Sequence, residues 1–413
     1  MTASVYLLRL GWGLTGIAVV ALVWVNPTHF TSIDSGYYLQ SASSLLAGRG
    51  YVITEDGQQV WNGVFPIGYS ALIALFAGLT GLPVLWASKA VNLLAVSLSV
   101  VLWQRRLGTN RTLWILSIWW LGSFLRLLAY TWSETVFLVL LAEWVWSLNI
   151  LLRTPARHRI VRLALLSIGL FLLRYIGGYI VGVLAFLALA LYLTPHRVQS
   201  LLRVPIPPGT HKALARVAGL SVAAISTYGW LNLHHTDSLY GGERFLPTEP
   251  MSTLLRLFAR SIGNELLLIR DFLPAVSNQL AWVGAGIQVL WLWLVSRRVH
   301  QQPIPWTHHP DLSFRSLNRL FILTGGLYIV VLFALRTVSP FSGPNARLMA
   351  PATFCFLMAF LLRVGNAHPV WQRKLRPFWI GLLLCSWLQL IPQGAKPAKI
   401  RLPDSWISAL RGF

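Results

Sequence analysis

Long apolar runs separated by short polar loops dominate the pattern of this 413-residue chain. A helix of about 20 apolar residues crosses the roughly 30 Å hydrocarbon core of a bilayer. The pattern therefore predicts an all-α, polytopic membrane protein with about eleven transmembrane helices in a single domain over residues 1–413. Their predicted ranges are 6–25, 84–104, 111–125, 134–152, 160–173, 177–194, 214–233, 273–296, 318–336, 347–363 and 377–392.

The first predicted outer loop, residues 26–83, is more elaborate than a connection between two spans requires. Residues 37–47 place apolar side chains on one helical face and polar side chains on another, which is typical of a helix lying in the membrane interface. Residues 66–80 begin with Pro and are followed by Gly-Leu-Pro, which predicts a second helix that is short for a crossing. Two interfacial helices are thus expected to flank a polar loop.

Composition and charge agree with a membrane protein. Hydrophobic residues make up 55% of the chain and charged residues only 11%, which excludes a soluble globular protein of this length. A net charge of +22 raises the alternative of a nucleic-acid binder, but the basic residues gather in every second loop, as the positive-inside rule predicts. These basic groups are Arg105, Arg106 and Arg111; Arg153, Arg157, Arg159 and Arg162; Arg197, Arg203, Lys212 and Arg216; Arg297, Arg298, Arg315 and Arg319; and Arg363, Arg373, Lys374 and Arg376. We expect membrane lipids, and no nucleic acid, as partners.

This charge pattern places the N-terminus inside and most carboxylates outside. The first apolar run lacks a small-residue cleavage site, so it is interpreted as a retained span. The other predicted outer segments are a loop at 234–272 and a C-terminal tail at 393–413. The outer acidic residues are Asp34, Glu55, Asp56, Glu134, Asp237, Glu243, Glu249, Glu265, Asp271 and Asp404, whereas Asp311 lies inside and Glu143 in or near a span.

Asp34 is the leading candidate for chemistry, because it directly follows the first span in a chain with only 12 acidic residues. A carboxylate within reach of an acceptor hydroxyl can remove its proton as a general base. The alternative is structural, since Asp before Ser-Gly-Tyr-Tyr is also a good helix N-cap. In both interpretations, Asp34 is predicted to lie at the outer face of the membrane.

Several short motifs, in this order and on this side of the membrane, resemble the GT-C membrane glycosyltransferases, particularly the protein O-mannosyltransferase and aminoarabinose-transferase branch. They are Asp34-Ser35-Gly36-Tyr37-Tyr38, Gly48-Arg49-Gly50-Tyr51, Phe65-Pro66-Ile67-Gly68-Tyr69-Ser70, Ser133-Glu134, Arg174-Tyr175 and Asn345-Ala346-Arg347-Leu348-Met349-Ala350-Pro351. The resemblance covers roughly residues 5–390.

The resemblance implies transfer of a sugar from a polyprenyl-phosphate donor to a lipid, glycan or protein acceptor, at the outer face of a bacterial cytoplasmic membrane. It implies a catalytic Asp34, and a role in substrate binding or in shaping the site for Tyr37, Tyr38, Glu134, Tyr69 and Tyr175. The chain departs from the family at Ser35, where several members carry a second acid, and in lacking a large soluble outer domain. No cofactor is assigned; a divalent cation, Mg²⁺ or Mn²⁺ held with the help of Glu134, stays open.

Leaving-group stabilisation requires cations near the donor phosphate. Arg174, Arg347 and Lys89 lie at predicted outer helix ends, where positive-inside sorting disfavours basic residues, and we assign them to phosphate binding. Their structural alternative is snorkelling to lipid head groups. For Glu134 the structural alternative is an ion pair with Arg126. We therefore expect Asp34 to lie near Arg174 or Arg347.

Two other function classes compete with an enzyme. A transporter or flippase of a lipid-linked sugar or phospholipid would use the outer arginines without forming a bond, and a scaffold subunit would not bring them to Asp34. The chain has no clear internal repeat of the kind seen in many transporters and no nucleotide-binding loop. A metal site is a further possibility, suggested by His234, His235 and Asp237. Adjacent histidines do not share a helical face, which argues against such a site.

Overall fold

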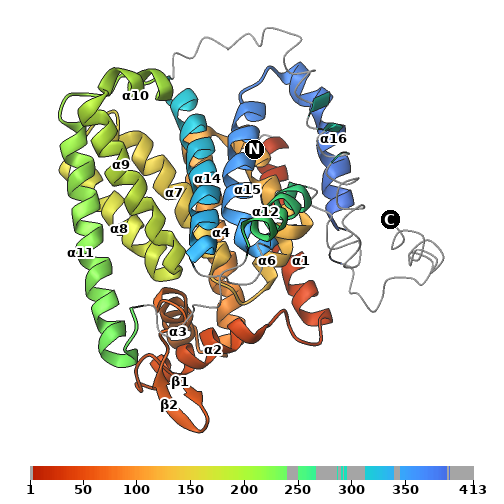
Figure 1. The fold of residues 1–413 in the computed structure, drawn as a ribbon. Helices are drawn as coiled ribbons and strands as arrows, with labels where there is room; N and C mark the ends of the chain where they lie inside the picture. Colours follow the sequence, from red (N-terminus) through yellow and green to blue (C-terminus); the bar gives the residue numbers. More distant parts are fainter. Residues whose placement is uncertain are drawn as a thin grey trace.

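The computed structural model describes residues 3–239, 250–266, 312–338 and 345–387, with isolated positions at 286, 290, 291, 293, 294 and 390. Figure 1 shows a bundle of long helices with two short helices and a hairpin at one end. The helices are α1 (Ala3–Val25), α2 (Ile33–Leu46), α3 (Gly68–Thr80), α4 (Val84–Leu107), α5 (Thr109–Leu116), α6 (Gly122–Ala129), α7 (Glu134–Leu151), α8 (Arg157–Leu173), α9 (Tyr179–Leu193), α10 (Pro195–Leu202), α11 (Thr210–Thr236), α12 (Met251–Leu266), α14 (Leu312–Val338), α15 (Ala346–Gly365) and α16 (Pro369–Trp387). Short 3-10 turns cover Ser117–Trp120 and Tyr175–Gly178.

Seven helical segments in the described part of the chain are long and apolar enough to cross a membrane. They are Val5–Val25, Val84–Leu107, Glu134–Leu151, Tyr175–Leu193, Thr210–Thr236, Phe314–Thr337 and Arg347–Gly365. Thr109–Trp120 and Gly122–Ala129 meet at 73° and make an eighth span if they form one broken crossing. The all-helical, polytopic class predicted from the sequence is confirmed. The count of eleven is not, because α8 has only 17 residues, α16 begins with a basic stretch, and most of 273–296 lies outside the described residues.

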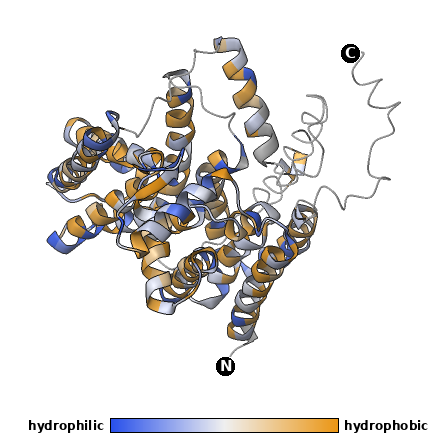
Figure 2. Ribbon diagram, turned by 90° about the horizontal axis from the view of Figure 1, so that it is seen from below, coloured by the Kyte–Doolittle hydropathy of each residue, from blue (hydrophilic) through white to orange (hydrophobic). Residues whose placement is uncertain are grey.

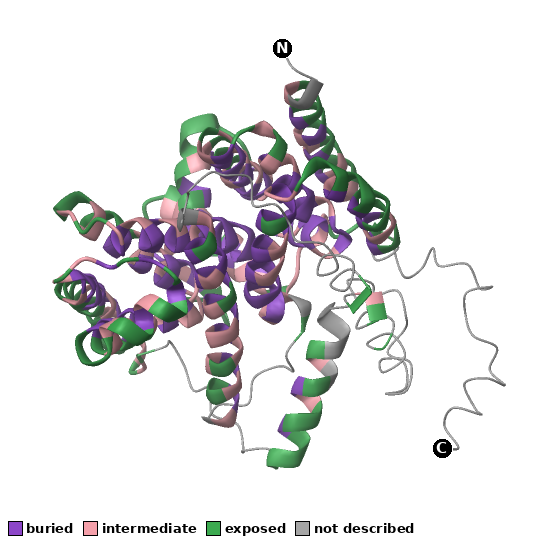
Figure 3. Cartoon of the chain, turned by 90° about the horizontal axis from the view of Figure 1, so that it is seen from above, coloured by how far each residue is buried: buried purple, intermediate pink, exposed green. Residues whose placement is uncertain are grey.

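The buried fraction of the spans distinguishes a central helix from peripheral helices. In α7, 83% of the span is buried, against 28% in α1 and α11. Figure 3, which looks along the bundle, shows buried positions concentrated in its middle and exposed positions on the outer helices. Apolar residues continue onto those outer helices in Figure 2, and α1 exposes Leu7, Leu14 and Ile17. Such surfaces suit contact with lipid, which is as apolar as the side chains themselves.

The segment between α1 and α4 contains the two short helices expected there, α2 and α3, together with a hairpin that was not predicted. Strands β1 (Val52–Glu55) and β2 (Gln58–Trp61) pair antiparallel, with Val52 opposite Trp61. Asp56 and Gly57 form the turn with φ of 49° and 79°. Asp-Gly is favoured in such two-residue turns because both positions need a positive φ. Of the remaining predicted outer segments, the loop at 234–272 is described except at 240–249 and 267–272, whereas all of 393–413 lies outside the described residues.

Helix α2 is capped and anchored at its first turn, which contains Asp34. The Ser32 side chain accepts a hydrogen bond from the backbone N–H of Ser35, and the Ser35 side chain accepts one from the N–H of Ser32, which together form a capping box. Ser35 Oγ also donates to the carbonyl of Thr131 at 3.0 Å. The first turn of α2 is therefore tied to the segment that leads into α7.

Candidate functional site

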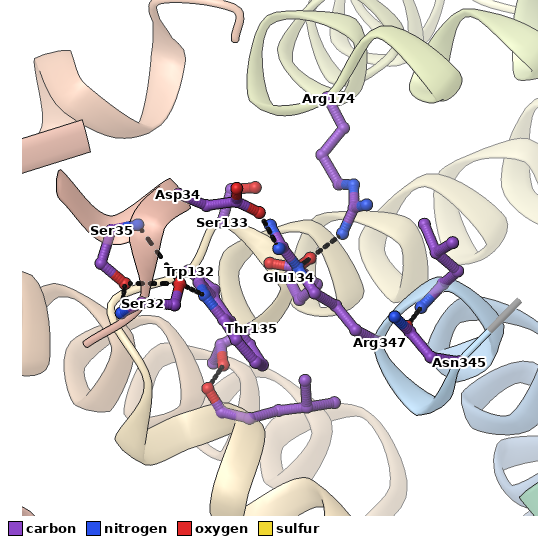
Figure 4. Close-up of polar contacts among 12 residues, drawn as sticks. Ser32, Asp34, Ser35, Trp132, Ser133, Glu134, Thr135, Arg174, Asn345 and Arg347 are labelled. Atoms are coloured by element: carbon purple, nitrogen blue, oxygen red, sulfur yellow. Dashed lines mark hydrogen bonds and ion pairs between the residues drawn. The ribbon is translucent and has the colours of Figure 1, made fainter. Parts of the chain in front are cut away.

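A buried carboxylate organises the group of charges at the end of the bundle that carries α2. Glu134, the first residue of α7, forms ion pairs with Arg174, the residue that ends α8, and with Arg347 in the first turn of α15. Arg347 also pairs with Asp34 in the first turn of α2 (Figure 4). Four segments far apart in the sequence therefore meet in one network. We call these four residues the charged cluster.

Exposure differs across the charged cluster. The Glu134 side chain is fully buried, Arg174 and Arg347 expose 12% and 17% of theirs, and Asp34 exposes 34%. Asp34 is thus the member open to an approaching molecule, whereas Glu134 is the internal anchor of both guanidinium groups. Glu134 Oε2 has no hydrogen-bond partner among the described residues. The start of α7 favours this carboxylate because the positive end of a helix dipole stabilises a negative charge.

Aromatic packing holds the Arg347 guanidinium. The guanidinium lies over the Trp132 ring, 4.5 Å from its centroid, which is the geometry of a cation–π contact. Trp132 stacks in turn on Tyr130 at 3.7 Å and donates from Nε1 to Ser32 Oγ at 2.8 Å. At the other end, Asn345 caps α15 by accepting from the N–H of Leu348 at 3.1 Å. These contacts leave Arg347 little freedom to turn away from Asp34.

The predicted tyrosines line the neighbouring core of α2 and α3. Tyr38 is buried, and its hydroxyl lies 3.1 Å from Ser133 Oγ, next to Glu134. Burial, reinforced by the Glu134 charge, raises the pKa of Tyr38 to about 12, so its phenol stays neutral near pH 7. Tyr69 packs edge-on against Tyr38 at 5.1 Å and donates to Asn92 Oδ1 at 3.1 Å. The partly exposed Tyr37 packs against Phe65 at 5.9 Å.

Tyr175, directly after Arg174, connects three segments of the same end. Its hydroxyl donates to the Gly63 carbonyl at 2.8 Å and accepts from Asn232 Nδ2 at 2.8 Å. Asn232 Oδ1 accepts in addition from Trp61 Nε1 at 3.0 Å. The first loop, the end of α8 and the end of α11 are thus joined beside the charged cluster.

Lys89 has an environment different from that of the arginines. Its ammonium group donates to the carbonyls of Phe30 and Ala129, at 3.2 and 2.7 Å, and to Thr131 Oγ1 at 2.8 Å. An ammonium has three N–H donors, and these three contacts use all of them. Lys89 is 3% exposed, so it joins α4 to the segment after α6 and presents no remaining donor to a ligand. The structure does not bring Lys89 into the charged cluster.

The structure also decides two of the alternatives raised by the sequence. The N-cap of α2 is Ser32, so Asp34 does not serve as the cap. Glu134 pairs with Arg174 and Arg347, two residues from distant helices, in place of the local pairing with Arg126 considered above.

A divalent cation fits this arrangement poorly. Arg347 contacts both Asp34 and Glu134, so a guanidinium already lies between the two carboxylates that a metal would need. Within the described residues, no group of three His, Cys, Asp or Glu side chains is placed to hold a metal ion. His235 instead stacks on Trp61 at 4.4 Å, and His234 on Trp230 at 5.9 Å.

Residues 130–133 contribute contacts that were not predicted, although Ser133-Glu134 was among the motifs singled out in the sequence. Trp132 supports Arg347, Thr131 accepts from Lys89 and Ser35, and Ser133 contacts Tyr38. Four polar or aromatic residues directly before the acidic start of a buried helix were the available signal. Arg347, Lys89, Ser35 and Tyr38, which make these contacts with them, come from distant parts of the chain, and a local pattern does not show such partners.

No protein-family model matches the chain, and no curated protein matches it in sequence. Among solved structures, the fold is similar to that in the crystal structure of ArnT from Cupriavidus metallidurans in the apo state. The sequences are 13% identical and the TM-score is 0.40, with 92% of this chain and 78% of the ArnT chain covered.

Proposed function

We propose that this protein is a membrane glycosyltransferase that moves a sugar from a polyprenyl-phosphate donor to an acceptor hydroxyl at the outer face of a bacterial cytoplasmic membrane. The observation that carries the proposal is the pairing of Asp34 with Arg347 inside the charged cluster. A partly exposed carboxylate beside a guanidinium provides, at one place, a base for the acceptor and a cation for the leaving group. The motif resemblance implies the same reaction.

The arginines suit the donor phosphate. Arg347 uses Nε for Glu134 and Nη1 for Asp34, and its Nη2 is the donor we assign to a phosphate oxygen. Arg174 adds a second guanidinium, which contacts the same Glu134 oxygen, Oε1, as Arg347 does. Buried Glu134 offsets part of this positive charge when no donor is bound, because charges in a membrane protein's interior need partners. Lys89 acts in this proposal as a positioning residue for the segment that carries Trp132 and Glu134.

The reaction is a single displacement at the anomeric carbon. The acceptor oxygen forms a bond to that carbon while its proton passes to the Asp34 carboxylate. The bond from the anomeric carbon to the phosphate oxygen breaks, and its electron pair leaves with polyprenyl phosphate. Arg347 and Arg174 stabilise the negative charge that grows on this phosphate. A one-step displacement inverts the anomeric configuration.

The deciding experiment compares wild-type protein with Asp34→Asn in proteoliposomes that contain radiolabelled polyprenyl-phosphate sugars and membrane extract as acceptor. We expect release of polyprenyl phosphate to fall by about 10²–10⁴-fold, because a general base contributes rate enhancement of this size. Donor binding, measured as retention of labelled donor, should stay near the wild-type level. Asp56→Asn is the matched control, since Asp56 lies in the hairpin turn of the same loop and should keep full activity.

The same assay tests the rival function of a transporter or flippase. A transporter would move the labelled donor between leaflets intact, with no release of polyprenyl phosphate. Turnover at the wild-type rate in Asp34→Asn would show that Asp34 is not the base. If the wild type moves the donor between leaflets but releases no polyprenyl phosphate, the protein is a transporter and not a glycosyltransferase.

A further inference from the structure

A second polar site lies at the end of the bundle opposite to the charged cluster. A cavity of about 350 Å³ opens there between the end of α10, the start of α14 and the end of α15. This volume falls in the range of small-molecule pockets. Arg347 begins α15 and Arg363 lies in its last turn, so the two sites are separated by about 24 Å along that helix at 1.5 Å per residue.

The lining of this cavity is strongly basic. Its polar residues are Arg203, Arg315, Arg319, Arg363, Asn318 and Asn366, and the described lining contains no carboxylate. Four guanidinium groups around one cavity repel one another unless anions compensate them. The positive-inside rule explains basic residues in a loop, but it does not require them to surround a shared cavity.

Hydrogen bonds to described residues hold Arg319 and Arg363 in place. Arg319 Nη1 donates to the carbonyls of Ser200 and Leu201, which orients it from α14 towards α10. Oriented so that both of its amide atoms find partners, Asn318 accepts from Arg363 Nε at 3.0 Å and donates to the Ala359 carbonyl. Such fixed guanidinium groups lose less side-chain freedom on binding an anion than free ones do.

The backbone conformation of Arg203 also indicates that an arginine side chain is needed at this position. Arg203 follows α10 with a φ of 53°, in the left-handed region. Gly or Asn usually occupies such a position after a helix, because other residues adopt it at a conformational cost. An arginine here places a third guanidinium at the cavity at that cost.

We propose that this cavity is a binding site for a phosphate-bearing anion, separate from the charged cluster. Guanidinium forks match phosphate oxygens in geometry and charge. The phosphate has two sources of the same chemistry: the head group of an anionic lipid in the adjacent leaflet, or a soluble phosphate compound. The site is independent of the glycosyl transfer proposed above.

The test measures thermal stability of the full-length protein in a neutral detergent, with inorganic pyrophosphate or phosphatidylglycerol added at constant ionic strength. A ligand that binds the folded state raises Tm in a saturable way. In Arg203→Gln/Arg363→Gln, we expect the apparent Kd to weaken by about tenfold or more, because two charge-assisted contacts are lost. The matched control is Arg197→Gln/Arg376→Gln, which removes the same charge from exposed positions of α10 and α16 outside the cavity.

Each outcome is informative. Stabilisation by pyrophosphate that only the cavity variant loses identifies a soluble phosphate compound, and the same result with phosphatidylglycerol alone identifies a lipid head group. Equal responses of the cavity variant and the wild type, equal losses in both double variants, or no response of the wild type to either ligand would overturn the proposal. If the double variant does not fold, the exposed single variant Arg203→Gln replaces it.

Discussion

At the residue scale, Glu134 is a buried charge that holds two arginines in place. Its carboxylate is fully buried and contacts the guanidinium groups of Arg174 and Arg347, and Arg347 also contacts Asp34. Removing one member of a buried ion pair leaves an uncompensated charge, which costs far more than an exposed pair contributes. Glu134 is therefore expected to stabilise the protein as well as to position Arg347.

Glu134→Gln keeps the shape of the side chain and removes its charge. We expect the free energy of unfolding to fall by about 3–5 kcal/mol, because two partly buried arginines lose their anchor. Chemical denaturation in detergent, followed by tryptophan fluorescence, measures this change.

The matched control is Glu55→Gln, a change at an exposed carboxylate of β1, which should stay within about 0.5 kcal/mol of the wild type. A Glu134→Gln protein as stable as that control would show that the buried pairs contribute nothing net.

At the element scale, the segment between α6 and α7 connects the charged cluster to the rest of the bundle. Residues 129–133 receive hydrogen bonds from Lys89 and Asn92 on α4 and from Ser35 on α2. This segment carries Trp132, on which Arg347 rests, and ends at Glu134. Hydrogen bonds from α2 and α4 thus fix the position of the irregular segment 130–133, which precedes Glu134.

Lys89→Met tests this positioning role against direct phosphate binding. The variant keeps the apolar stem but removes the ammonium that donates to two carbonyls and a hydroxyl, of which the Phe30 carbonyl keeps a bond from the Thr131 N–H. We therefore expect stability to fall by about 1–3 kcal/mol. Lys212→Met, at an exposed lysine of α11, is the control and should be neutral. If Lys89 instead binds the donor phosphate, the variant keeps wild-type stability and shows only a raised KM for the donor.

At the scale of the whole molecule, the two ends of the bundle differ in chemistry. The end with α2 and α3 carries the charged cluster, and the opposite end carries the cavity lined by four arginines. Exposed basic residues of α10 and α16 lie at that second end, in agreement with the positive-inside orientation predicted from the sequence. On this predicted orientation, the proposed reaction faces outward.

Cysteine labelling tests this orientation. In a variant without Cys355 and Cys385, we expect Asp56→Cys in the hairpin to react with a membrane-impermeant maleimide in intact spheroplasts, and Arg197→Cys in α10 to react only after permeabilisation. Both positions are exposed, so access is limited by the membrane alone. The reverse pattern would place the charged cluster inside and would exclude a reaction at the outer face.

Much of the fold could be predicted from the amino-acid sequence. Apolar runs of bilayer length and the basic loops between them predicted the helical class, because burial of a helix in lipid depends on local hydrophobicity alone. Helices α2 and α3 lie close to the predicted ranges 37–47 and 66–80, because amphipathic spacing and bounding Pro and Gly residues are local signals. Asp34 and Arg347 were singled out because a charge near a bilayer is costly and therefore rare.

The contacts among those residues depended on the folded bundle. The sequence separates Asp34 from Arg347 by 313 positions, and no local pattern indicates that one guanidinium joins it to Glu134. Lys89 shares every sequence feature of a phosphate-binding cation, yet the packing of α4 against the loop after α6 uses its three donors internally. Local hydrophobicity determines which segments enter the membrane, whereas the partner of each buried charge is set by the distant helix that packs against it.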